Sequence, residues 1–350
     1  MLSLIKKILK EFRITYAFIL RFFLPVQFYF IRKSLNFPKI NLLYKSKFDR
    51  NVKFWLSSVT LKDKKFTAFR VTPRYFRYYK AFLKTSFTSV ILNSNNKKKT
   101  FYGSQDPKLF KYKNKILLYL QKSKKFSSDC EISLYDTSLN KTYNINSPFK
   151  HNGKNWVPIS GINSLIFIYS IDPLVLLKVV DLNKGKMKTI NKIKKGTIPE
   201  WNTKNILDSP FTKSLFTGGG SKRGGSPMVK VGNNTYLGIG HSSKNLFNYF
   251  RQIGSTQRAY IYLFDFKKKI YYINYLTNNK INHLYCTGAE LTHNKNIIKF
   301  NFSYSSILIE YIVSNIYLFD IELDKRELIK IAKKGVRKKI NLITGHKNIN

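Results

Sequence analysis

Short runs of apolar residues alternate with polar turns along most of the chain from residue 51 onward. The runs are rich in Ile, Leu, Val, Tyr and Phe, and clusters of Asn, Gly, Lys and Asp separate them. Runs of this length with such boundaries are typical of β-strands, whereas the i, i+3, i+4 spacing of amphipathic helices is scarce. The pattern therefore predicts an all-β domain.

One strand–turn–strand pattern recurs five times. Each copy has an apolar run that ends in Asp or Asn, then a polar turn, then a second run. An Asp or Asn side chain at the start of a turn can accept a hydrogen bond from the backbone two residues on, so each copy predicts a β-hairpin. The copies span residues 89–102, 132–145, 177–190, 261–274 and 316–329, with turn residues Asn93, Asp136, Asp181, Asp265 and Asp320.

The spacing of these hairpins indicates a repeat architecture. The turn residues recur at intervals in the forties and fifties, apart from one longer interval that holds an inserted loop over residues 197–225. Repeats of this length with four strands each are typical of β-propeller blades, in which the hairpin would form the outer pair of strands. We predict an all-β fold, a five-bladed β-propeller over residues 50–330 with a basic tail over 331–350. A β-sandwich or a different number of blades is the alternative.

Residues 1–35 differ from the rest of the chain. Four basic residues precede an apolar, aromatic stretch from Ile14 to Ile31, and about 18 residues is the short end of a membrane span. Arg21 near its middle would cost about 2.5–3.5 kcal/mol in a bilayer. No small-residue cleavage site follows. This helical leader is therefore interpreted in three ways, as a marginal signal anchor, an interfacial helix or a helix packed on the domain. A cytoplasmic and a membrane-associated location both stay open.

The charge of the chain is strongly positive. Its 350 residues include 63 Lys plus Arg against 18 Asp plus Glu, a formal net charge of +45. This excess favours contact with phosphates or acidic glycans and raises the hypothesis of a nucleic-acid or anionic membrane partner. The lysines are spread through turn-like runs, however, so we favour solvated turn charge and expect no specific nucleic-acid partner. The two cysteines, Cys130 and Cys286, form neither a disulfide framework nor a zinc site, and no metal is expected.

Unusual residues cluster in the segments that precede the hairpins and would line the central channel. These segments are FTAFR (66–70), GSQDPKLF (103–110), KNWVPI (154–159) with LIFIYSIDP (165–173), RGGSPMVKV (223–231) with YLGIGHS (236–242), and CTGAELTHNKNIIKF (286–300). In this order the series resembles the five-bladed mannoside phosphorylases and the related β-1,2-mannosyltransferases. The resemblance covers roughly residues 50–330, and KNW, YSIDP and RGGSP are specific only as a set.

The resemblance implies a glycan-active enzyme, a glycosyltransferase or a glycoside phosphorylase acting on mannose-like sugars of an oligosaccharide or glycan. Asp106 would be the general acid or its relay, acting through a sugar hydroxyl. Convergent donors would hold phosphate, a sugar phosphate or a nucleotide sugar as co-substrate, with no bound cofactor. Gly224 and Gly225 would let the backbone approach a ligand closely. The implied substrate- and phosphate-binding residues are Arg70, Lys108, Lys154, Asn155, Arg223, His241 and Tyr249, and Trp156 and Tyr169 would stack on a sugar ring.

Three departures from the family pattern bear on activity. Gln105 replaces the Glu before the Asp, Lys108 replaces an Arg, and residues 301–308 lack the Asp often found in the fifth blade. Hydrolysis needs a second carboxylate to activate water, so one surviving acid argues against a hydrolase. It fits phosphorolysis, glycosyl transfer or a decayed site that only binds glycans. Each residue also has a structural interpretation, Asp106 as a turn cap and Trp156 as core. The oligomeric state stays open.

Overall fold

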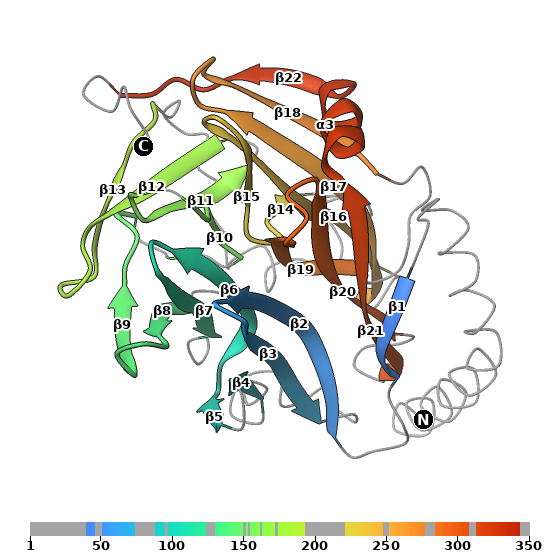
Figure 1. Ribbon diagram of the computed structural model, residues 1–350. Helices are drawn as coiled ribbons and strands as arrows, with labels where there is room; N and C mark the ends of the chain where they lie inside the picture. Colours follow the sequence, from blue (N-terminus) through green and yellow to red (C-terminus); the bar gives the residue numbers. More distant parts are fainter. Residues whose placement is uncertain are drawn as a thin grey trace, which may run out of the picture.

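The computed structural model contains five antiparallel β-sheets arranged around a common centre (Figure 1). The chain is therefore a five-bladed β-propeller, and the prediction from the hairpin spacing is confirmed. The expected leader over residues 1–35 lies outside the described residues. The structure describes residues 40–45, 51–73, 88–94, 97–123, 130–149, 152, 155–161, 163–171, 174–192, 221–247, 252–276, 284–307 and 313–343.

Blades 1 to 3 each take four successive strands, and the first strand of each pairs only with the second. Blade 1 contains β2 (Asn51–Leu61), β3 (Lys64–Pro73), β4 (Ser89–Ser94) and β5 (Lys97–Tyr102). Blade 2 contains β6 (Gln105–Tyr112), β7 (Lys115–Ser123), β8 (Cys130–Asp136) and β9 (Lys141–Ile145). Blade 3 contains β10 (Val157–Pro158), β11 (Ile166–Ile171), β12 (Leu174–Asp181) and β13 (Lys186–Thr189).

Blades 4 and 5 have additional or exchanged strands. In blade 4 two short inner strands, β14 and β15, both pair with β16, and β22 adds to the outer edge beyond β18. Blade 4 contains β14 (Ser221–Arg223), β15 (Val229–Gly232), β16 (Thr235–Phe247), β17 (Gln252–Asp265), β18 (Ile270–Tyr275) and β22 (Val336–Lys339). Blade 5 contains β19 (Leu284–Leu291), β20 (Ile297–Ile307), β21 (Val313–Asp324) and β1 (Ile40–Lys45).

Four of the five predicted hairpins are confirmed, as β4–β5, β8–β9, β12–β13 and β17–β18. Three of these turns use the predicted acids. The Oδ1 atom of Asp136 accepts from the backbone N–H groups of Ser138 at 3.0 Å and Leu139 at 3.2 Å. Asp181 and Asp265 each accept from the N–H three residues on, at 3.0 and 2.9 Å. These side chains satisfy the turn backbone, which is the structural role expected of Asx turns.

The fifth hairpin prediction is wrong. Strand β21 runs through Asp320 to Asp324, and helix α3 (Lys325–Lys333) follows it. Asp324 caps this helix, because its Oδ1 accepts from the N–H groups two and three residues on, at 2.7 and 3.0 Å. Leu328 and Ala332 lie four residues apart and are buried on one helix face. The segment directly after β21 therefore packs as an amphipathic helix and forms no outer strand of blade 5.

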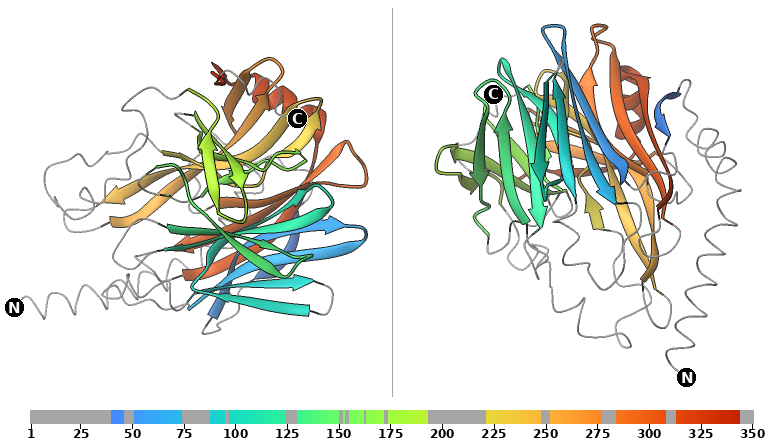
Figure 2. Two further views of the ribbon diagram at one scale, coloured as in Figure 1. Left: turned by 90° about the vertical axis from the view of Figure 1, so that its left-hand side faces the viewer. Right: turned by 90° about the horizontal axis from the view of Figure 1, so that it is seen from below.

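The folded unit extends on both sides of the predicted 50–330 range. Strand β1 pairs antiparallel with β21, with Ile40 opposite Ile321 and Lys45 opposite Tyr317, and it supplies the outer strand of blade 5 (Figure 2). Strand β22 lies within the segment expected as a tail and pairs with β18. A further bridge joins Asn191 to Leu342. The chain before residue 50 and the chain after residue 330 thus both contribute to the blades.

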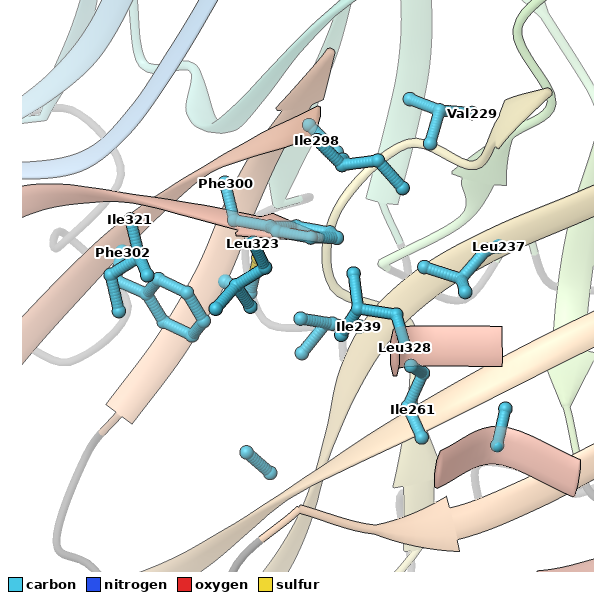
Figure 3. Close-up of a cluster of buried hydrophobic side chains, with 14 of the residues drawn as sticks. Val229, Leu237, Ile239, Ile261, Ile298, Phe300, Phe302, Ile321, Leu323 and Leu328 are labelled. Atoms are coloured by element: carbon cyan, nitrogen blue, oxygen red, sulfur yellow. The ribbon is translucent and has the colours of Figure 1, made fainter. Parts of the chain in front are cut away.

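Among the described residues, the hydrophobic core consists of five clusters, and each lies between two neighbouring blades. The cluster between blades 4 and 5 includes Phe300, Phe302 and Ile239, and also receives Leu328 of α3 (Figure 3). The cluster between blades 5 and 1 is the smallest among the described residues, with four buried members, Leu56, Phe69, Ile316 and Leu318. Burial of apolar surface between blades therefore holds the ring together.

Within the part of the chain that the structure describes, no helix is long and apolar enough to cross a membrane.

Candidate functional site

The inner strands of the blades carry irregularities at comparable positions. The register with the second strand shifts around Trp55 in β2, around Asp106 in β6 and between Cys286 and Gly288 in β19. Trp55 and Asp106 have positive φ values of 46° and 51°, and Asn155, just before β10, has 65°. Non-glycine residues rarely adopt this region, and bulges often re-aim side chains beside functional sites. The bulges therefore indicate a candidate functional site at the inner strands.

Asp106 lies in a buried polar group that joins blades 1 and 2. Its Oδ1 atom is 3.3 Å from Nη1 of Arg70 on β3, and its Oδ2 accepts a hydrogen bond from Nε2 of Gln121 on β7. The three residues are 8%, 6% and 2% exposed, respectively. An opposite charge at this distance favours the ionised carboxylate. Both oxygens of Asp106 are thus held by side chains from the second strands of two blades.

Gln121 is itself held by groups from blades 2 and 3. Its Oε1 atom accepts from the backbone N–H of Asn155 at 2.9 Å and from the hydroxyl of Tyr119 at 3.3 Å. Burial raises the pKa of Tyr119 well above its ordinary value, so this hydroxyl keeps its proton and remains a donor. The orientation of the Gln121 amide is therefore specified on both sides.

Lys108 lies two residues after Asp106 and is also buried. Its Nζ atom donates to the carbonyl oxygen of Trp156 at 2.8 Å and lies 4.9 Å from the ring centroid of Tyr119. Burial lowers the pKa of Lys108 to about 7, although the charge of Asp106 acts in the opposite direction. Burial likewise lowers the pKa of Arg70, again against the effect of Asp106. At neutral pH, the Lys108 amine is therefore divided between its charged and neutral forms.

Aromatic rings connect this polar group to His241 in blade 4. The guanidinium carbon of Arg70 lies 4.7 Å from the ring centroid of Trp55, a cation–π arrangement. Trp55 packs edge-on against Tyr285, with ring centroids 5.3 Å apart, and Tyr285 packs edge-on against His241 at 4.9 Å. Residues of blades 1, 2, 4 and 5 thus form one continuous cluster.

Several residues predicted from the sequence come together in this cluster. Arg70, Asp106 and Lys108 lie within it, Asn155 joins through its backbone N–H, and His241 joins through Tyr285. Sequence reasoning missed four members, because none of them belongs to a motif and their role arises only from packing between blades. The missed residues are Trp55, Tyr119, Gln121 and Tyr285.

The structure corrects the roles expected for Trp156 and Tyr169. Trp156 is 0% exposed in the core between blades 2 and 3, and its indole N–H donates to the carbonyl oxygen of Asn152 at 2.6 Å. Tyr169 is also buried, packed between Trp156 and Phe149 with ring centroids 5.8 and 5.1 Å away. Rings enclosed in this way have no face for a sugar, so both residues are core residues here.

Gly224 and Gly225 were expected to let the backbone approach a ligand closely, but the space beside them is occupied by neighbouring residues of the protein. A Cβ atom on Gly225 would meet the carbonyl oxygens of Ile239 and Cys286, the latter at 2.8 Å. A Cβ atom on Gly224 would meet Val157 and the carbonyl oxygen of Asn155. The glycines therefore permit close contact of blades 3, 4 and 5 at the inner strands.

Three predicted residues lack a described side chain. Lys154 and Tyr249 lie outside the described residues, and Arg223 is placed only by its backbone, in β14 opposite His241. The described ranges contain no group of three His, Cys, Asp or Glu side chains that could hold a metal ion. Cys130 and Cys286 are both buried free thiols.

Searches with this chain found no matching family profile and no matching curated protein. Similar solved structures include a hypothetical protein from Leishmania major, with 10% identity and a TM-score of 0.49 over 87% of this chain and 94% of that chain. A glycosyl hydrolase from Bacteroides ovatus has 10% identity and a TM-score of 0.46, covering 83% of this chain and 87% of its own. The beta-1,2-mannobiose phosphorylase from Listeria innocua also has 10% identity and a TM-score of 0.46, and the match covers 84% of this chain and 97% of that chain. The named activities are those of the other proteins.

Proposed function

We propose that this chain is a glycan-active propeller that transfers a mannose-like glycosyl group between a phosphate-bearing donor and a sugar hydroxyl, by glycosyl transfer or by phosphorolysis. The observation that carries the proposal is the Asp106 carboxylate, which lies at a bulge with positive φ and is held by Arg70 and Gln121. Bulges and strained backbone of this kind cluster at functional sites.

The ion pair with Arg70 suits the synthetic direction of such a reaction. An ionised Asp106 takes the proton of the acceptor hydroxyl, directly or through a second sugar hydroxyl. The acceptor oxygen forms a bond to C1 of the donor, the bond from C1 to the phosphate oxygen breaks, and phosphate or a nucleotide leaves with the bonding electrons. Phosphorolysis is the reverse, and it begins with the proton on Asp106.

The basic residues around Asp106 support a phosphate-bearing co-substrate. Arg70 and Lys108 lie beside the carboxylate, and His241 joins the same cluster through Tyr285. Several convergent donors are what a phosphate group requires. No second carboxylate lies in this cluster among the described residues, so nothing there would activate water in the manner of an inverting hydrolase.

One observation favours a second candidate, a glycan-binding propeller without turnover. Both oxygens of Asp106 already have protein partners, and Gln105 stands where the resembled family has a carboxylate. A site that retained these side chains and lost its chemistry would look the same.

A release assay on the full-length protein tests the proposal. Mannose 1-phosphate or a nucleotide mannose is offered with mannose or short mannosides as acceptors, and the release of phosphate or nucleotide is followed. Asp106→Asn should lower turnover about 100-fold or more, because it removes the group that accepts the proton. The matched control is Asp181→Asn, which makes the same change at a turn of blade 3 and should leave turnover intact.

The outcomes separate the two candidates. Turnover that survives Asp106→Asn would show that Asp106 has no role in the proton transfer. No release with any donor, together with mannoside binding in calorimetry, would support the binding propeller and overturn the proposed reaction.

A further inference from the structure

The Gln121 side chain connects blades 2 and 3 through a single amide group. Its oxygen faces two donors, the Asn155 backbone N–H at 2.9 Å and the Tyr119 hydroxyl at 3.3 Å, and its nitrogen faces Oδ2 of Asp106. Gln121 is 2% exposed, so these protein groups and not bulk water determine its orientation.

Only one orientation of this amide satisfies its neighbours. Rotation of the amide by half a turn would direct its NH2 group at the Asn155 N–H, which can only donate, and its oxygen at a carboxylate oxygen. Buried donors and acceptors without partners are costly, so the surroundings exclude this orientation. With the amide fixed, Oδ2 of Asp106 must act as an acceptor.

We propose that Gln121 is a positioning residue for Asp106, which reserves Oδ2 as a hydrogen-bond acceptor and thereby directs any proton that the carboxylate takes up to Oδ1. Oδ1 has the longer contact, 3.3 Å to Arg70, and an oxygen with two lone pairs can carry a proton while it still accepts from the guanidinium. The inference rests on the proposed function, in which Asp106 exchanges a proton with a sugar hydroxyl.

Among the described residues, the charged and titratable groups that face Asp106 come from three strands. Arg70 lies on β3, Lys108 on β6 and Tyr119 on β7, and Tyr285 on β19 acts on Arg70. Tyr119 is a hydroxyl at all ordinary pH values, while Lys108 changes its charge near neutrality. A test of Gln121 must therefore separate its effect on Asp106 from the titration of Lys108.

The variant Gln121→Glu provides that separation. The new side chain has nearly the same shape and retains an oxygen for Asn155 and Tyr119, but it replaces the amide donor with a second carboxylate oxygen. Two carboxylates at hydrogen-bond distance share a proton, which moves one titration to higher pH by about one unit or more. The acid limb of the pH–turnover profile should move upward to the same extent, and a limb that stays in place would show that Asp106 does not carry the titrating proton.

A readout independent of turnover is the carbon-13 NMR titration of aspartate-labelled full-length protein. The Asp106 signal is identified by its absence from Asp106→Asn. Its midpoint should move upward by about one pH unit or more in Gln121→Glu and also rise in Gln121→Leu, which removes the donor. Gln105→Leu is the matched control, because Gln105 lies opposite Gln121 in the strand pairing, and this variant should leave the midpoint in place.

Each outcome bears on the proposal. An Asp106 midpoint that stays in place in Gln121→Glu and in Gln121→Leu would overturn the positioning role, even if the wild type turns over. A midpoint that moves in a protein without turnover would support the positioning role and reject the proposed reaction. Should Gln121→Leu fail to fold, Tyr119→Phe removes one of the two donors that orient the amide and should move the midpoint in the same direction.

Discussion

At the scale of single residues, burial controls the charges around Asp106. Removing water from a charged group disfavours its ionised form, and a nearby opposite charge restores it in part. For Lys108, burial has the larger effect, and its pKa falls to about 7 despite Asp106. The positive charge of the candidate site is therefore a function of pH in the neutral range.

Lys108→Met should change how stability depends on pH. The pKa of Lys108 in the folded protein is about 7, below the model-peptide value of 10.5, so between these values the unfolded chain binds more protons and stability rises with pH. The variant removes this cost of burying an amine, so it should be more stable than wild type near pH 7, and the difference should shrink towards pH 10. Thermal unfolding from pH 6.5 to 10 measures it.

The control for this prediction is Lys111→Met, on the same strand but partly exposed. The difference in melting temperature between this variant and wild type should not change with pH. A Lys108→Met difference that also stays constant with pH would show that Lys108 keeps an ordinary titration in the folded protein.

Candidate-site residues that belong to a sequence motif could be predicted from the sequence. Those that belong to no motif could not. Asp106, Arg70 and Lys108 follow from the D-P turn and the Arg strand, which are local in sequence. The partner of Asp106, Gln121, lies in the unremarkable run ILLYLQK, and nothing there marks it as polar and buried. The misassigned Trp156 has a local motif too, but its burial depends on blades 2 and 3 packing together. Contacts between blades are what a reading of the sequence lacks.

At the scale of elements, the inner strands combine bulges with close packing of backbone. Gly225 lies between β14 and β15, where blade 4 approaches Cys286 of blade 5. This approach leaves no room for a side chain, so the glycine serves the assembly of the inner strands.

Gly225→Ala should destabilise the protein by about 1–3 kcal/mol, the usual cost of forcing extra atoms into a packed site. Gly232→Ala is the matched control on β15. A Cβ atom there would have ordinary contacts of 3.5 Å to Thr235, and the change should be neutral or slightly stabilising. Denaturant unfolding of both variants checks the pair, and equal stabilities would contradict the packing role of Gly225.

The hairpins, which are predicted from residues close together in the sequence, were predicted well. One copy of the same local pattern was misleading. Four hairpins follow from an Asp or Asn at the start of a turn, and Asp136 shows the mechanism through its bonds to Ser138 and Leu139. The fifth copy has the same local pattern around Asp320, yet the strand continues and a helix follows Asp324. The apolar face of that helix finds its partners in blades 4 and 5, which no local pattern reveals.

At the scale of the whole molecule, a strand from one end of the chain completes a blade built by the other end. Strand β1 covers the outer edge of β21, next to the smallest of the five described clusters. This closure could not be predicted from the repeats, because residues 40–45 belong to no complete hairpin copy.

A chain that starts at residue 46 should therefore be less stable than one that starts at residue 40. The shorter chain loses the pairing of β1 with β21, and each backbone hydrogen bond contributes about 1 kcal/mol net. For a domain of this size the loss should lower the melting temperature by about 10 °C. Circular dichroism on both truncated chains measures it. Equal melting temperatures would show that β1 does not stabilise the ring.

The pairing of β1 with β21 also imposes an order on events during synthesis. The ribosome delivers β1 before the other described strands, and its partner β21 emerges only after blades 1 to 3 and strands β14 to β18 of blade 4 have been made. Until then β1 has no neighbour in its sheet, and the seam between blades 5 and 1 is open. Contacts between such distant parts of a chain form slowly, and unpaired edges of partly folded chains are prone to aggregate. Ring closure is thus the step at which the nascent chain is most exposed to misassembly, and the one for which it would most benefit from a chaperone.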